Sequence, residues 1–171
     1  MRALVWIVED TWEATVAEAA AFLPGDAEVT LLHVAPSAVE AVAEGSRHGL
    51  LGRRRHPPRH GPPTPPEPVR AISDEAAAAL LAEARARFGR DARTERRRGR
   101  VGHEVAAAAD GMDLLVLARD GDHSRLGPHS LGPAARFVVD HAPCRVLLVW
   151  ADAPPGVDTI PPPPAHPPHR R

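Results

Sequence analysis

The sequence contains no lysine, asparagine, glutamine or tyrosine. Walker-type phosphate loops place a lysine against the β- and γ-phosphates, and receiver domains use a lysine near their last strand, so both classes are disfavoured. Alanine, arginine, proline and glycine are abundant instead, a bias typical of a high-GC bacterial genome. Arginine and proline are therefore weak signals of function in this chain.

The chain also has few features of a secreted or membrane protein. A single cysteine, Cys144, excludes an internal disulfide framework and suits a reducing compartment. No apolar run approaches the roughly 18 residues of a membrane span, and the opening MRALVWIVED lacks the basic flank and cleavage site of a signal peptide. We expect a cytoplasmic protein that does not associate with membranes.

The protein as a whole is not expected to attract polyanions such as nucleic acids, because its formal net charge is −1. Arginine is nevertheless concentrated in RRRHPPRH, residues 53–60. No aromatic residue interrupts this run to stack on a base, so a solvated linker is favoured over a nucleic-acid surface. Ten histidines show no compact Cys/His spacing of the structural-zinc kind, and we expect no metal site.

Length and composition indicate one domain, because 171 residues with 43% hydrophobic content can bury a single core. We place this domain at residues 1–150. Proline, arginine and histidine dominate residues 46–70, which we interpret as a flexible insertion. Residues 151–171 are also proline-rich, and we expect a disordered or polyproline-like tail.

Strand-length apolar runs alternate with helix-like segments along the chain. The expected buried strands are Leu4–Val8, Glu28–Val34, Asp113–Ala118 and Arg145–Trp150, and the charged run Asp91–Arg98 is expected to be an exposed edge strand. The expected helices cover residues 11–23, 73–88, 103–109 and 131–141, with Thr11 and Ser73 as caps and a short alanine-rich helix between Ser37 and Gly45. Five strands in this alternation predict an α/β fold with a parallel, doubly wound sheet.

Three stretches together resemble the universal stress protein family. They are LVWIVEDTWE, in which Asp10 follows the first strand, then LLHV, and finally the block from DLLVLA to LGPAARFVVDHAPCRVLLVW. The resemblance implies strand order 3-2-1-4-5, an adenine nucleotide alpha hydrolase-like fold, and a homodimer formed through the fifth strand, Val146 to Trp150. It also implies a role in stress adaptation without an established catalytic reaction, and therefore no catalytic residues.

ATP-binding members of that family carry a Gly-x2-Gly-x9-Gly-Ser/Thr pattern after the fourth strand. Its glycines let backbone N–H groups approach phosphate, while the hydroxyl and a helix N-terminus complete the anion site. Here Ala118 replaces the first glycine, Gly121 matches the second, and Gly132 falls one residue late. Pro133 follows it and supplies neither a hydroxyl nor a backbone N–H.

Other residues of the loop could replace the missing phosphate donors. The candidates are Arg119, His123, Arg125, His129 and Ser130, of which the arginines can bind phosphate through two hydrogen bonds. The loop from Arg119 to Gly132 is then an adapted anion site. The alternative is a connector that has lost its ligand.

The resemblance also assigns roles outside this loop. Asp10 would hold a ribose hydroxyl, or it is simply an acidic residue at a helix N-terminus. Val34 would contact adenine, although a buried strand residue is the favoured interpretation. Trp6 and Trp12 flank Asp10 and could stack on a base, but we favour a core position for Trp6 and a surface or interface position for Trp12.

The resemblance, together with the departures from the family's glycine pattern, leads us to expect one of two functions. The first is a non-enzymatic stress-response regulator that binds an adenine nucleotide, with ATP as the candidate cofactor, through a modified glycine loop. The second is a structural or protein-interaction dimer that has lost nucleotide binding. Slow ATP hydrolysis is a weaker alternative, because no base or metal constellation is evident in the sequence.

Overall fold

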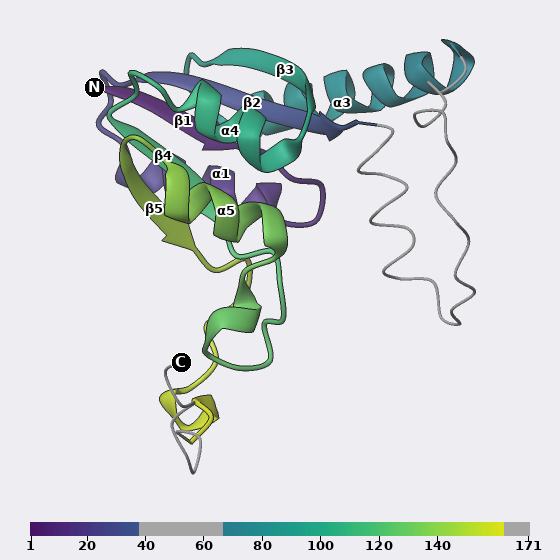
Figure 1. Cartoon of the computed structure of the whole chain (residues 1–171). Coiled ribbons are helices and arrows are strands. Elements are labelled where there is room, and N and C mark those ends of the chain that lie inside the picture. Colours follow the sequence, from purple (N-terminus) through teal and green to yellow (C-terminus); the bar gives the residue numbers. More distant parts are fainter. Residues whose placement is uncertain (38–66, 163–171) are drawn as a thin grey trace, which may run out of the picture.

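Residues 1–37 and 67–162 are described by the computed structural model of the chain. Within them, one sheet of five parallel strands has the order β3-β2-β1-β4-β5 (Figure 1). The strands are β1 (Arg2–Trp6), β2 (Glu28–Pro36), β3 (Arg93–Gly99), β4 (Leu114–Ala118) and β5 (Arg145–Val149). The predicted doubly wound fold and its strand order are thereby confirmed.

Helices cover both faces of the sheet (Figure 1). The described helices are α1 (Trp12–Phe22), α3 (Glu67–Phe88), α4 (Val101–Ala108) and α5 (Pro133–His141), with short 3₁₀ turns η1 (Pro128–Ser130) and η2 (Val157–Thr159). Side chains of α1 and α3 share one buried cluster with the sheet, and side chains of α4 and α5 share the other. None of the helices in residues 1–37 and 67–162 is long and apolar enough to cross a membrane.

Burial explains the composition of the strands. All five residues of β4 are buried, and four of the five in β1 are, because helices cover these central strands on both sides. The edge strand β3 reads RTERRRG and is largely exposed, as its charge predicted. The other edge strand, β5, is apolar and only half-buried over Val146, Leu147 and Leu148.

The helix before β3 differs from its predicted bounds. Helix α3 begins at Glu67, well before Ser73, so Ser73 lies inside the helix and does not cap it. Pro68 does not prevent this earlier start, because the first turn of a helix has no intrahelical use for the missing N–H. The last residues of the expected insertion are therefore helical. The rest of it, and the short helix expected after Ser37, lie outside the described residues.

The first part of the expected disordered tail also differs from the prediction. Residues 157–159 form η2, in which the backbone N–H of Thr159 donates to the Gly156 carbonyl at 3.0 Å. The backbone N–H of Leu126 donates to Thr159 Oγ1 at 3.0 Å, which ties this segment to the loop between β4 and α5 (Figure 1). Such contacts cannot be read from composition. Residues 163–171 lie outside the described part of the chain.

A core substitution tests the two-layer packing. Leu115 is fully buried in β4 and packs in the cluster that α4 and α5 cover. We expect Leu115→Ala to lower the free energy of unfolding by about 2–5 kcal/mol, measured by urea denaturation. Val139→Ala, on the exposed side of α5, is the matched control and should change it by at most about 0.5 kcal/mol. Equal losses for both variants would contradict this core.

Asp113, the residue immediately before β4, predicts a pH dependence of stability. The Arg2 backbone N–H donates to Asp113 Oδ2 at 2.7 Å, and this hydrogen bond lowers the pKa of Asp113. A carboxylate with a lowered folded-state pKa stabilises the fold above its unfolded-state pKa, and this contribution disappears as pH falls through the folded-state value.

Asp113→Asn should therefore unfold at lower urea concentration than the wild type at neutral pH. The difference should narrow through a series of increasingly acidic buffers, because protonation removes the same charge from the wild type. A difference that does not change with pH would refute the role of the ionised carboxylate.

Candidate functional site

A crevice of about 740 Å³ lies at the carboxyl ends of β1 and β2. The N-terminal residues of α4 and α5 complete its walls, together with Asp120 of the loop after β4. Doubly wound sheets bind their ligands at this edge, because the connections leave the strands in opposite directions there. We call this cavity the strand-end crevice.

Two of the predicted site residues, Asp10 and Val34, line the strand-end crevice together. Asp10 lies in the turn after β1 and is exposed, so its carboxylate is accessible to a ligand. Val34 lies in β2 and is only 4% exposed, so it can offer a ligand little more than the edge of its side chain. Residues far apart in the sequence thus meet because β1 and β2 pair in parallel.

The strand-end crevice has an acidic neighbour. An adjoining cavity of about 680 Å³ shares Glu9, Asp10 and Asp120 with it, and Glu13 and Asp152 add two further carboxyl groups. Positive charge on the crevice side comes from Arg100. His33 lies at the base, where its Nδ1 is 3.1 Å from the Ile7 carbonyl oxygen and its Nε2 is 3.9 Å from Glu9 Oε1.

Gly121 lines the adjoining cavity and also closes the loop after β4. Its backbone N–H donates to the Ser130 carbonyl at 3.1 Å, and that of Asp122 donates to the His129 carbonyl at 2.9 Å. A Cβ atom on Gly121 would overlap the His129 carbonyl oxygen. Glycine is therefore required here by the close approach of the two sides of the loop.

Arg119 and Ser130 hold the loop to the end of β5. The Arg119 guanidinium donates to Ser130 Oγ and lies over the Trp150 ring, 4.6 Å from its centre. Ser130 is fully buried, and its hydroxyl donates to the Gly127 carbonyl at 2.7 Å. Ala118 is the last residue of β4 and is buried beside Val149. These contacts stabilise the loop, and the described lining of the strand-end crevice does not include Arg119 or Ser130.

Arg125 lies farther along the same loop. Its Nε is 3.5 Å from Asp122 Oδ2, and it lines a small apolar cavity beside Leu126 and Pro128. Hydrogen bonds from the Ser124 hydroxyl and backbone N–H lower the pKa of Asp122. The structure therefore separates Arg125 from Asp10 and Val34.

Asp120 is the functional candidate that sequence reasoning missed. It lines both cavities, and its Oδ1 accepts a hydrogen bond from the backbone N–H of Gly132 at 2.7 Å. Gly132 is the N-cap of α5, and a Cβ atom there would lie 2.9 Å from Asp120 Oδ2. No spacing rule links Asp120 to Gly132, because only the closure of the loop brings them together.

Neither metal ligation nor thiol chemistry finds support among the described residues. Residues 1–37 and 67–162 contain no group of three or more His, Cys, Asp or Glu side chains placed to hold a metal ion. Burial, and to a smaller extent the charge of Asp113, raises the pKa of the half-buried Cys144 thiol. A raised pKa disfavours the reactive thiolate at neutral pH.

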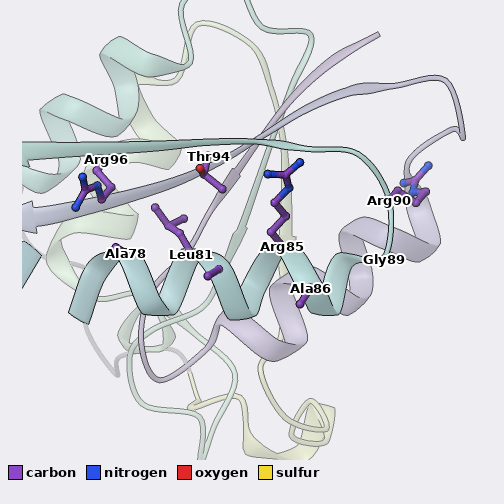
Figure 2. A pocket seen from close by; sticks show the side chains of 9 residues that line it. Ala78, Leu81, Arg85, Ala86, Gly89, Arg90, Thr94 and Arg96 are labelled. Carbon is purple, nitrogen blue, oxygen red and sulfur yellow. The ribbon is translucent and has the colours of Figure 1, made fainter. Parts of the chain in front are cut away.

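A second groove, of about 700 Å³, lies between α3 and the edge strand β3. Figure 2 shows Arg85 rising from α3 toward β3, with Leu81 on the same helix. Arg85 Nη2 lies 3.4 Å from Asp91 Oδ1, and Arg96 Nη1 donates to the Asp74 carbonyl oxygen at 2.9 Å. Since α3 covers the opposite face of the sheet from α4 and α5, this groove is separate from the strand-end crevice.

Comparison with solved structures identifies the same fold in other proteins. UspA from Lactobacillus plantarum is 21% identical, with a TM-score of 0.53, over 87% of this chain and 97% of that one. A universal stress protein in complex with cAMP is 15% identical, with a TM-score of 0.58, over 89% and 98% of the two chains. A family member from Arabidopsis thaliana with AMP bound is 14% identical, with a TM-score of 0.52, over 90% and 93%.

Sequence comparison gives the family directly. No functionally curated protein matches the chain at a significant level. The sequence profile of the universal stress protein family matches residues 53–149, which is more than half of the chain. Together with the parallel sheet of order 3-2-1-4-5, this match shows that the chain belongs to the universal stress protein family.

Proposed function

We propose that this protein is a non-enzymatic regulator of the stress response that binds an adenine nucleoside or nucleotide in the strand-end crevice. The observation that carries the proposal is the convergence of Asp10, Val34 and the N-terminal end of α5 on one cavity. The cAMP and AMP bound to two proteins of the same fold support this ligand class.

The geometry suggests how each part of such a ligand would bind. The exposed Asp10 carboxylate would accept hydrogen bonds from ribose hydroxyl groups, which donate readily to a charged acceptor. The base would lie against the apolar wall that includes Val34 and Val101. The remaining end of the ligand would point toward Asp120, Gly121 and the N-terminus of α5.

The loop between β4 and α5 could transmit the effect of ligand binding to the β5 edge of the protein. Gly121 lines the adjoining cavity, while Arg119 of the same loop donates to Ser130 and lies against the Trp150 ring beyond β5. We propose that ligand binding acts through this loop on the β5 edge, where two copies of the chain would pair. The half-buried apolar side chains of β5 suit such an interface.

The second candidate function is a protein-interaction dimer that has lost nucleotide binding. Pro133 favours it, because the first residue of α5 has no backbone N–H for a phosphate. In this case the β5 edge and the segments outside the family domain would carry the function. Binding experiments distinguish the two candidates.

Calorimetry with adenosine, AMP, cAMP, ADP and ATP, each with and without magnesium, tests the main proposal. We expect at least one of these ligands to bind, and Asp10→Ala to weaken binding by about 1–3 kcal/mol through loss of a charged hydrogen-bond acceptor. Asp110→Ala, an exposed acidic residue after α4, is the control and should bind as the wild type does. Absence of binding by the wild type at millimolar concentrations of every ligand would favour the interaction module.

Sedimentation equilibrium tests the proposed dimer. We expect the full chain to sediment as a dimer, and Val146→Glu to shift it toward the monomer, because a charge at the half-buried β5 edge opposes apolar pairing. Val139→Glu places the same charge on the exposed side of α5 and should remain dimeric. Circular dichroism would establish that both variants fold. A wild type that stays monomeric at high concentration would overturn the dimer.

A further inference from the structure

The side-chain carboxylate of Asp120 lies at the N-terminus of α5. Asp120 Oδ1 accepts the Gly132 N–H at 2.7 Å, and the carboxylate packs against the Gly132 backbone. A helix N-terminus attracts negative charge through its unused N–H groups and its dipole. Asp120 therefore already uses the Gly132 N–H, one of the donors that a bound phosphate would otherwise engage at this helix end.

Neighbouring residues also disfavour the binding of a phosphate at the N-terminus of α5. Pro133, the first residue of α5, removes one of the N–H groups that a phosphate could use. Glu9, Asp10 and Asp120 line the strand-end crevice, and Asp152 lies on the adjoining cavity. Because like charges a few ångströms apart repel, each added phosphate charge raises the free energy of the bound state.

The two arginines of the loop, which could offset this charge, face elsewhere, and His123, which lines the adjoining cavity, has its Nδ1 3.5 Å from Asp152 Oδ2. The Arg119 guanidinium contacts Ser130 and Trp150, and Arg125 lies beside Asp122. Of the arginines in the described chain, Arg100 lines the crevice, at the N-terminal end of α4. The end of the crevice beside α5 is thus lined by the Asp120 carboxylate and by the uncharged side chains of Pro133, Ala134 and Phe137.

From this geometry we infer that the crevice selects adenine nucleosides over adenine nucleotides, and that Asp120 is the residue that sets this preference. The inference rests on the proposed function and names the ligand class more narrowly. A neutral nucleoside can use Asp10 and the apolar wall without displacing Asp120. A nucleotide must move the Asp120 carboxylate away from Gly132 or accept its repulsion, so affinity falls in the order adenosine, cAMP, AMP, ATP.

Two substitutions separate the charge of Asp120 from its occupation of the helix end. Asp120→Asn keeps an oxygen that can accept the Gly132 N–H but removes the charge, whereas Asp120→Ala removes both. Asp122→Asn removes a neighbouring carboxylate of the same loop, which the described lining of the crevice does not include, and serves as the control. The measurement is calorimetric affinity for adenosine and for AMP, without magnesium, on the full chain.

We expect the wild type to bind adenosine more tightly than AMP. Asp120→Ala should raise the affinity for AMP by about tenfold, the scale of a charge interaction at a partly buried helix N-terminus, with a smaller gain for Asp120→Asn. Adenosine affinity should change less than about twofold in both variants, since an uncharged ligand neither competes with nor is repelled by the carboxylate. Asp122→Asn should keep the wild-type ratio of the two affinities.

Two other outcomes would overturn the inference in different ways. If AMP binds but its affinity relative to adenosine is the same in the wild type, Asp120→Asn and Asp120→Ala, then Asp120 does not select the ligand, while the proposed function stands. If neither ligand binds to any of these proteins, the proposed function fails together with the inference. Thermal unfolding of each variant would establish that it is folded under the conditions of the measurement.

Discussion

Burial of β1 and β4 on both faces is the constraint on which the rest of this structure depends. Their side chains are almost wholly apolar, and two helical layers exclude water from them. A strand buried in this way pairs in parallel with its neighbours, because helical crossovers must return over the sheet. The carboxyl ends of β1, β2 and β4 consequently lie at one edge, where the strand-end crevice forms.

The loop after β4 depends on that arrangement, and its internal contacts decide which of its side chains line the crevice. Gly121 allows the two sides of the loop to approach each other. The buried Ser130 hydroxyl donates to the Gly127 carbonyl and stabilises the loop before α5. Arg119 turns away from the crevice to the Trp150 ring beyond β5. Asp120, by contrast, lines the crevice and accepts a hydrogen bond from the backbone N–H of Gly132, the N-cap of α5.

In the outer parts of the chain, local composition predicted one element correctly and misled at two others. The charged β3 segment was identified as an edge strand because charge discourages further pairing, and its exposure agrees. The proline-rich composition of residues 46–70 suggested a flexible insertion, yet a helix begins at Glu67, since a proline such as Pro68 is tolerated in a first turn. Proline also suggested a disordered tail, whereas the hydrogen bond from Leu126 to Thr159 ties residues of that tail to the loop.

The sequence by itself determined the fold class, because apolar runs such as LLVLA and the alternation of strands with helices predict a parallel, doubly wound sheet, while the resemblance to the universal stress protein family supplied the strand order. It also identified the loss of the glycine pattern at Ala118 and Pro133. Only the tertiary structure decided which charged groups face the crevice. Arg119 and Asp120 are adjacent in the chain, but loop closure turns one toward Trp150 and the other toward Gly132. Side-chain direction in a loop follows from long-range hydrogen bonds, which no local pattern encodes.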